Sequence, residues 1–295
     1  MSDFRAYAQL VRLPNLPSAL ADICLGALVA HALPQHGFSF ATLLLASACL
    51  YSAGMVWNDY FDREQDRRER PLRPLPSGRI SSRHAIRLGM GLLTAGVLLS
   101  ATAGTTSILL VLCLVGAILS YDGWLKYTWA GPLAMGACRF LNVLLGVSAC
   151  GSLLGARGVH VAMIVGLYIV GVTWFARTEA RTSNQNALRG AAAVMLSSLL
   201  LALPLPIFIP QGQRSSFLFP YLLVALGFLV GVPIWRAIAR PVPSQVQAAV
   251  QAALMSLILL DAVLATATAG SVGLLILLLL VPSLYLNRRK WLYAT

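Results

Sequence analysis

Half of the acidic residues in this chain lie in one short segment. Of the 10 Asp and Glu residues, five fall between Asp59 and Glu69, within the sequence NDYFDREQDRRER. If this segment is helical, Asn58, Asp62 and Asp66 are at positions i, i+4 and i+8 and stack on one face, with Asp59 one step away. Like charges in such a row repel one another unless a cation binds them. Oxygen ligands suit Mg²⁺, which takes one or two carboxylates and shares its other positions between water and phosphates.

The same segment is rich in arginine, whose guanidinium group can bind phosphate oxygens through two donors at once. The arginines are Arg63, Arg67, Arg68, Arg70, Arg73, Arg79 and Arg83. Carboxylates, a metal and arginines together indicate a diphosphate site, in which Arg63 and Arg67 contact the substrate. The alternative is a solvated loop whose charges pair with one another and whose arginines fix the topology. The four-residue steps and the Asn-Asp start at a membrane boundary favour the metal.

These residues resemble a known motif. NDxxDxxxD is similar to the first aspartate-rich motif of the UbiA-type intramembrane prenyltransferases, and Asn58, Asp59, Asp62 and Asp66 match it position by position. Three further segments also resemble that family: RLPNLPSALAD at 12–22, RPLRPLPSGRIS at 70–81 and YDGWLK at 121–126. The resemblance implies an all-helical bundle with a central cavity. It also implies transfer of a prenyl group from a prenyl diphosphate to a hydrophobic or aromatic acceptor, with Mg²⁺ as the cofactor.

The resemblance assigns roles to residues beyond the acidic segment. Asn58, Asp62 and Asp66 would hold the metal, and Asp59 would lie beside the substrate. In the family's Tyr-x-x-x-x-Lys segment, Tyr121 would contact the substrate and Lys126 would neutralise charge that develops on the diphosphate. Two residues follow near the start of the fifth span, Arg139 as a catalytic residue and Asn142 on the same helix face as a substrate ligand. The alternatives are a lysine that sets topology and an asparagine that bonds helix to helix.

The family's second aspartate-rich motif is weak in this chain. The segment TWFARTEARTSNQNALRG at 173–190 has Glu179 as its only carboxylate, with Arg177 and Arg181 beside it. Three interpretations stay open. Glu179 holds a second Mg²⁺, the arginines replace part of the metal's charge and bind substrate, or the protein keeps the fold without catalysis. TWFARTEA and the long final segment are similar to a divergent branch of the superfamily found in Ebo-type biosynthetic clusters.

The elements that must position these residues are membrane-spanning helices. The chain is 58% hydrophobic and 11% charged, and uncharged runs near 20 residues long are the length that crosses a bilayer. The sequence therefore predicts an all-α polytopic bundle of nine or ten spans, in one integral membrane domain over residues 1–295. The ten candidates are 16–34, 39–58, 84–104, 106–121, 131–152, 159–177, 189–209, 217–235, 247–267 and 270–286. Nine results if 247–286 contains one span and a re-entrant piece.

The basic residues predict the orientation of these spans. With the N-terminus in the cytoplasm, only Arg157 and Arg214 fall outside, as the positive-inside rule requires. Those inside are Arg5, Arg12, the 59–87 loop, Lys126, Arg177, Arg181, Arg189, Arg236, Arg240 and 288–290. The polar loops at 59–83, 122–130 and 178–188 are then cytoplasmic. We therefore expect a multi-pass protein of the cytoplasmic membrane with its active-site loops inside.

Other functions compete with prenyl transfer. The net charge of +12 does not indicate nucleic-acid binding, because the basic residues lie at the ends of apolar segments. Asp22 and Asp261 are carboxylates within apolar spans, as carriers often have, so a transporter or export component for a lipid or small molecule is an alternative. A carrier needs titratable groups near the midplane, whereas this chain concentrates its carboxylates at the interface beside arginines. A non-catalytic protein of the same fold is the remaining alternative.

Overall fold

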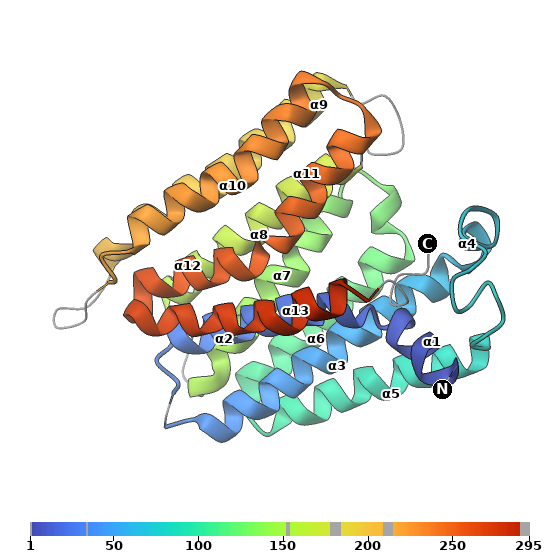
Figure 1. The fold of residues 1–295 in the computed structure, drawn as a ribbon. Helices are drawn as coiled ribbons and strands as arrows, with labels where there is room; N and C mark the ends of the chain where they lie inside the picture. The colour runs from blue at the N-terminus through green and yellow to red at the C-terminus, as the bar shows by residue number, and fades with distance from the viewer. Residues whose placement is uncertain (1, 34, 152–153, 178–183, 209–214, 290–295) are drawn as a thin grey trace.

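The computed structural model describes residues 2–33, 35–151, 154–177, 184–208 and 215–289, and within them the chain forms helices and no strands (Figure 1). The α-helices are α1 (Ser2–Leu10), α2 (Leu16–Val29), α3 (Gly37–Phe61), α4 (Arg63–Glu69), α5 (Ser82–Ala101), α6 (Thr105–Gly123), α7 (Gly131–Val147), α8 (Ala156–Ala176), α9 (Gln185–Leu200), α10 (Phe219–Ala239), α11 (Pro243–Met255), α12 (Leu257–Ala269) and α13 (Leu280–Asn287). The 3₁₀ segments are η1 (Leu13–Asn15), η2 (Leu125–Tyr127), η3 (Ser148–Cys150), η4 (Leu205–Phe208) and η5 (Gly270–Leu279). The all-α prediction is confirmed.

The long helices coincide with the predicted spans. Eight helical stretches in the described residues are long and apolar enough to cross a membrane, and Leu13–Val29 is a shorter apolar one. The last of the eight, Pro243–Asn287, contains a reversal at Gly270, which has φ 69°. After this turn η5 packs against α12 and the chain runs back along it (Figure 1). The polytopic bundle is confirmed, whereas the choice between nine and ten spans stays a prediction.

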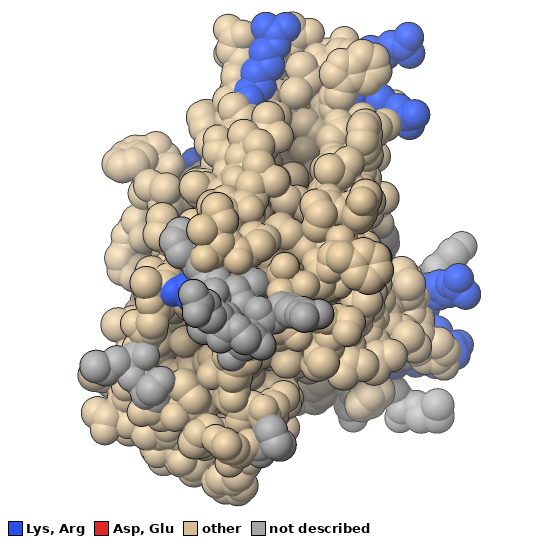
Figure 2. All heavy atoms as spheres, turned by 90° about the vertical axis from the view of Figure 1, so that its left-hand side faces the viewer, with Lys and Arg blue, Asp and Glu red and all other residues tan. Residues whose placement is uncertain are grey.

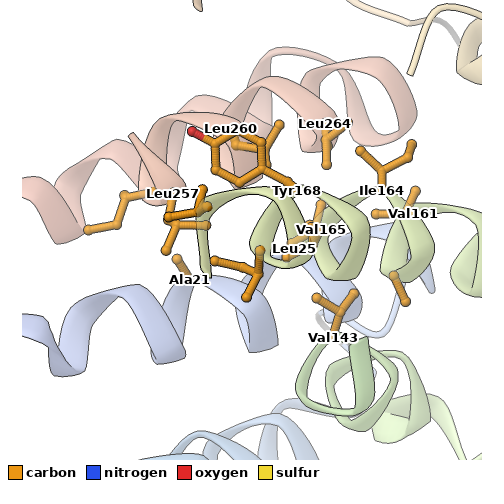
Figure 3. Close-up of a cluster of buried hydrophobic side chains, with 14 of the residues drawn as sticks. Ala21, Leu25, Val143, Val161, Ile164, Val165, Tyr168, Leu257, Leu260 and Leu264 are labelled. Carbon is orange, nitrogen blue, oxygen red and sulfur yellow. The ribbon is translucent and has the colours of Figure 1, made fainter. Parts of the chain in front are cut away.

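The centre of the bundle is a tightly packed apolar core. Buried side chains of α2, α7, α8 and α12 meet there, including Leu25, Val143, Tyr168 and Leu260 (Figure 3). The hydroxyl of Tyr168, the one polar group on a labelled side chain of this cluster, donates to the carbonyl oxygen of Ala253 at 3.1 Å. A buried tyrosine needs such a partner, so its hydrogen bond fixes α8 against α11.

Glycines allow α2 and α7 to lie in close contact. A Cβ atom on Gly26 would lie 2.3 Å from the carbonyl oxygen of Val143, and one on Gly146 would lie 2.5 Å from that of Ile23. Small residues are typical of helix interfaces in membranes, because lipid tails give apolar side chains no reason to prefer another helix and close backbone approach increases van der Waals contact. The α2–α7 contact is therefore set by residues without side chains.

The outer surface is largely apolar. The face in Figure 2 shows no acidic side chain, and most of its Lys and Arg side chains lie at the upper end and along the right-hand margin. On α10 the exposed residues include Tyr221, Phe228 and Trp235, which are 72%, 68% and 68% exposed. An apolar surface of this extent is unfavourable in water and suits the hydrocarbon of a bilayer.

Candidate active site

The acidic segment is two helices and not one. α3 ends at Phe61 and α4 begins at Arg63, with Asp62 between them, so the second span does not continue unbroken through 58–66. The backbone N–H of Asp62 still donates to Asn58 at 3.0 Å, and that of Asp66 donates to Asp62 at 2.8 Å. The spacing is thus retained while the carboxylates turn to different partners. α4 and α1 lie together at one end of the bundle (Figure 1).

Asp59 and Asp66 share one arginine. Nη1 of Arg73 lies 2.7 Å from Oδ2 of Asp66 and 3.4 Å from Oδ1 of Asp59, and both carboxylates are buried. Arg12 also pairs with Oδ1 of Asp59, at 3.1 Å. Burial opposes the charge on Arg12, but Asp59 together with Tyr51 and Asp122 favours it, so the pKa of Arg12 is raised. The buried carboxylates are therefore neutralised by arginines from before and after the acidic segment.

Asp62 faces the loop that follows α6. Nζ of Lys126 lies 2.6 Å from Oδ1 of Asp62, and the hydroxyl of Tyr127 donates to the same oxygen at 2.5 Å. Partial burial of the hydroxyl and this hydrogen bond raise the pKa of Tyr127, so it remains a donor. The predicted meeting of Lys126 with the acidic segment is present, and it joins the 59–83 and 122–130 loops.

Asp122 completes this end of the site. With its amide nitrogen facing Asp122, Asn58 donates to Oδ1 of Asp122 at 3.2 Å and accepts from Arg12 at 3.2 Å. Asp122, in the last turn of α6, is buried and lines a cavity of about 490 Å³ together with Arg12 and Tyr121. The apolar part of the wall includes Leu50, Ile118, Ile169, Val172 and Leu257. One end of an apolar cavity therefore meets the acidic cluster.

Arg139 and Asn142 also line the cavity. Nη1 of Arg139 pairs with Oδ2 of Asp22 at 3.0 Å, and the amide of Asn142 donates to the same oxygen at 2.8 Å. Ser47 donates to Asn142 at 2.8 Å. The predicted shared helix face of Arg139 and Asn142 is confirmed, and Asp22, the intramembrane carboxylate, is the group they both hold.

Several predicted residues lie outside the cavity wall. Arg63 donates to the carbonyl oxygen of Tyr60 at 2.9 Å, and Arg67 pairs with Glu64 at 2.9 Å on the exposed surface of α4. Arg177 donates to the carbonyl oxygens of Lys126 and Thr128, so it fastens the loop after α6. Glu179 and Arg181 lie outside the described residues.

Sequence reasoning missed Arg12 and Asp122 as members of the site. It placed Arg73 among the seven arginines of the diphosphate site but did not predict its pairing with Asp59 and Asp66. The signal for Asp122 was its position next to Tyr121 in YDGWLK, where an acidic residue borders an apolar run. No spacing rule relates these residues to Asp59 or Asn58, because the contacts cross from one helix to another.

The oxygen ligands of this cluster fit a hard cation such as Mg²⁺. Carboxylates and an amide oxygen are the groups it prefers, and here Arg73 and Lys126 place positive nitrogen atoms against the same oxygens. Within the described residues, groups of three or more His, Cys, Asp or Glu placed to hold a metal are absent. One or two carboxylates with water and diphosphate oxygens would complete the usual coordination of Mg²⁺.

The bundle of apolar helices indicates an integral membrane protein. Its internal cavity, with a polar cluster beside it, indicates an enzyme or a binding protein for a molecule that is partly apolar. The chain belongs to the UbiA prenyltransferase family, whose family model matches residues 19–257. The resemblance noted in the sequence is thereby confirmed. The comparison does not address the Ebo-type branch, which stays a prediction.

The relatives in this family that the chain resembles include digeranylgeranylglyceryl phosphate synthases. The one from Saccharolobus solfataricus is 26% identical over 243 residues, covering 77% of this chain and 85% of the relative. The one from Methanopyrus kandleri is 35% identical over 125 residues, covering 42% of this chain and 43% of the relative. In that second match the chain spans less than half of its relative's length.

Solved structures show the same fold. The apo structure of a UbiA homolog from Aeropyrum pernix is 20% identical with a TM-score of 0.67, covering 86% of this chain and 97% of the other. A UbiA homolog from Archaeoglobus fulgidus, bound to GPP and Mg²⁺, is 13% identical with a TM-score of 0.63, covering 84% and 98%. At these identities the likeness concerns the fold alone.

Proposed function

We propose that this protein transfers a prenyl group from a prenyl diphosphate to a hydrophobic or aromatic acceptor within the membrane, with Mg²⁺ as cofactor. The observation that carries the proposal is that a charged cluster adjoins an apolar cavity. Arg12 and Asp122 line an apolar cavity of about 490 Å³, and the same two residues contact Asp59 and Asn58 of the acidic segment. A prenyl diphosphate has a charged head group, which fits the charged cluster, and an apolar chain, which fits the cavity.

Different residues of the chain have different roles in the proposed reaction. Asn58, Asp62 and Asp66 would hold Mg²⁺, with Glu179 as the ligand of a second ion. When bound, the metal supplies positive charge that stabilises the leaving diphosphate. Lys126 supplies a point charge at the same place, and Asp59 orients Arg12 and Arg73. The arginines of the loops, Arg63, Arg67, Arg177 and Arg181, would attract the diphosphate from the aqueous side.

The bond changes are those of an allylic substitution. The C–O bond to the diphosphate breaks, and the diphosphate leaves with the electron pair. The acceptor forms the new bond to the prenyl carbon and loses one proton. The apolar wall would limit the access of water, which would otherwise capture the allylic cation, and the aromatic rings of Tyr51 and Tyr121, which also line the cavity, could stabilise positive charge.

The comparisons support this proposal at the level of the reaction class. The relatives carry the name digeranylgeranylglyceryl phosphate synthase, and the structural neighbour from A. fulgidus holds GPP and Mg²⁺. The transporter alternative is weakened, because one of its two intramembrane carboxylates, Asp22, is paired with Arg139. We further propose that residues 1–295 form one domain, with the N-terminus and the acidic segment on the cytoplasmic side.

The test is transfer from radiolabelled prenyl diphosphates of several chain lengths by the purified protein in nanodiscs, with a panel of lipid-soluble phenols and alcohols as acceptors. We expect Mg²⁺-dependent release of diphosphate and a labelled product. Asp62→Ala or Asp66→Ala should lower turnover at least about a hundredfold, or about 2.7 kcal/mol, because the metal ligands are lost. Glu69→Ala, an exposed acidic residue of the same helix, is the matched control.

Two results would contradict the proposal. Full turnover in both Asp62→Ala and Asp66→Ala would remove the metal assignment. Binding of prenyl diphosphate without release of diphosphate under any condition would favour the non-catalytic alternative.

A further inference from the structure

The inner part of the cavity contains polar groups that the diphosphate site does not use. Asp22 of α2 is fully buried and pairs with Arg139 of α7, and Asn142 donates to the same carboxylate oxygen. These helices lie in the apolar part of the bundle beside the core of Figure 3. Charged groups within membrane-spanning helices are costly and are usually kept for a function.

Arg139 lines the cavity and has hydrogen-bond donors to spare. Its Nη1 contacts Asp22 and the carbonyl oxygen of Ser18, at 3.0 Å each, and its Nη2 donates to Oγ of Ser18 at 2.9 Å. A guanidinium group has five N–H donors, so two have no partner among the described residues. The Arg139 side chain is 15% exposed where it lines the cavity, so a ligand oxygen at this wall could accept from these donors.

Asp261 is a second buried carboxyl group within the membrane-spanning helices. Both carboxyl oxygens of Asp261, and Oδ1 of Asp22, are buried and have no hydrogen-bond partner within the described part of the chain. α12, which carries Asp261, packs against α2, which carries Asp22. A carboxyl group in its neutral form has an O–H donor, and the free oxygen of its neighbour is an acceptor. A single proton between the two carboxyl groups pairs Oδ1 of Asp22 with one oxygen of Asp261.

This arrangement selects the charge of a ligand. With one proton on the acidic pair, the remaining negative charge on Asp22 cancels the positive charge on Arg139. An anionic head would then enter a low-dielectric site without a free counter-charge, and a cationic head would meet Arg139. An uncharged oxygen can accept from the spare N–H groups at no such cost, and apolar residues such as Ile169 and Val172 surround the body of the molecule.

We propose that the inner part of the cavity is the acceptor subsite, where Arg139 donates hydrogen bonds to the uncharged hydroxyl or carbonyl oxygen of a lipophilic acceptor. Asp22 and Asp261 are positioning residues, which hold Arg139 through their shared proton. The role of this subsite in binding the acceptor rests on the proposed function. The binding of an uncharged oxygen at Arg139 is independent of it, because that binding follows from the local hydrogen bonds and charges alone.

The test compares three fluorescent probes with one ring system, namely naphthalene, 2-naphthol and 2-naphthoate. Each is titrated into the purified full-length protein in detergent, with protein-free micelles as the blank. We expect 2-naphthol to bind at least tenfold more tightly than naphthalene or 2-naphthoate. Arg139→Gln, and the double variant Asp22→Asn/Arg139→Gln that removes both charges together, should lose this preference and keep the affinity for naphthalene.

Equal binding of naphthol and naphthalene, tightest binding of naphthoate, or an unchanged preference in both variants would overturn the subsite. The double variant keeps the test decisive if the single one fails to fold.

The acidic pair is tested by two replacements of one residue. Asp261→Asn retains an N–H donor toward Asp22 without a titratable proton, so the preference for naphthol should remain. Asp261→Leu has no donor, leaves Oδ1 of Asp22 unsatisfied and should reduce the preference at least tenfold. Equal preferences in the two variants would refute the shared proton, because a merely space-filling role would not distinguish an amide from leucine of similar volume.

Failure of this inference and of the proposed function are separable. Mg²⁺-dependent binding of geranyl diphosphate should be abolished by Asp62→Ala, and the same variant should retain the preference for 2-naphthol. If the native protein does not bind geranyl diphosphate, the proposed function and the acceptor role fail. The naphthol preference alone then decides whether the subsite exists.

Discussion

At the scale of single residues, three carboxylates of the site, those of Asp59, Asp62 and Asp66, are each paired with a cation from elsewhere in the chain. Asp66 depends on Arg73, Asp59 on Arg73 and Arg12, and Asp62 on Lys126. These cations balance the charge of the cluster when no metal is bound. A divalent cation would compete with them for the same oxygens, so metal binding and these ion pairs are linked.

Arg73 provides a test of that linkage that needs no substrate. Arg73→Gln leaves two buried carboxylates without their shared cation, so the protein without metal should lose about 3 kcal/mol of stability. Mg²⁺ should restore much of the loss, because it supplies the missing charge. Thermal unfolding in detergent, followed by circular dichroism with and without Mg²⁺, measures both effects.

Arg67→Gln is the matched control for Arg73→Gln. Its partner Glu64 is exposed, with 64% of the side chain accessible, and exposed pairs contribute less than about 1 kcal/mol. An equal response of the two variants to Mg²⁺ would contradict the assignment of Asp66 to the metal site.

At the scale of elements, the contact between α2 and α7 positions the inner part of the cavity. Asp22 and Gly26 are four residues apart on α2, as Asn142 and Gly146 are on α7, so each pair shares one helix face. The glycines bring the backbones together, and the same approach brings Asp22 within reach of Asn142 at 2.8 Å. The helix packing and the polar contact therefore depend on each other.

Gly26→Ala should separate these helices. The new Cβ atom would lie 2.3 Å from a backbone oxygen that cannot move aside, so we expect a loss of about 1–3 kcal/mol and a lower midpoint of thermal unfolding. Gly116→Ala in α6 is the control, since no atom lies within 4 Å of its Cβ position and alanine favours a helix. If Gly26→Ala were as stable as Gly116→Ala, the close contact would not be limiting.

At the scale of the whole molecule, the distribution of charge predicts which side of the membrane holds the acidic segment. The segments with most Lys and Arg are those that contain or adjoin the site, and basic loops remain in the cytoplasm. A prenyl diphosphate is charged and water-soluble at its head, so a cytoplasmic site is reached without crossing the bilayer.

Single cysteines at Ser77 and Gln185 test this orientation. Both positions are exposed, and the five native cysteines are replaced beforehand. Each introduced thiol should resist impermeant maleimides in intact cells and react in inverted vesicles. Thr105→Cys, at the predicted opposite side, should show the reverse. Labelling of Ser77→Cys from outside would reverse the topology and move the site with it.

Part of this molecule is determined by the sequence alone. The length of uncharged runs, the turns between them and the acidic segment are local properties, because crossing a hydrocarbon layer requires a run of apolar residues with satisfied backbone groups. The helices, and the meeting of Lys126 with Asp62, were therefore predictable, the latter with the help of the family resemblance.

The tertiary structure decided which charges neutralise one another. Asp22 and Arg139 are separated by 117 residues, and Arg12 and Asp59 by 47. No local pattern relates such residues, because their contact depends on how the helices pack. The end of α3 at Phe61 was decided in the same way, since Asp66 and Asp59 meet at Arg73 while Asp62 turns to Lys126. The sequence determined which chemical groups are present, and packing determined which of them share a site.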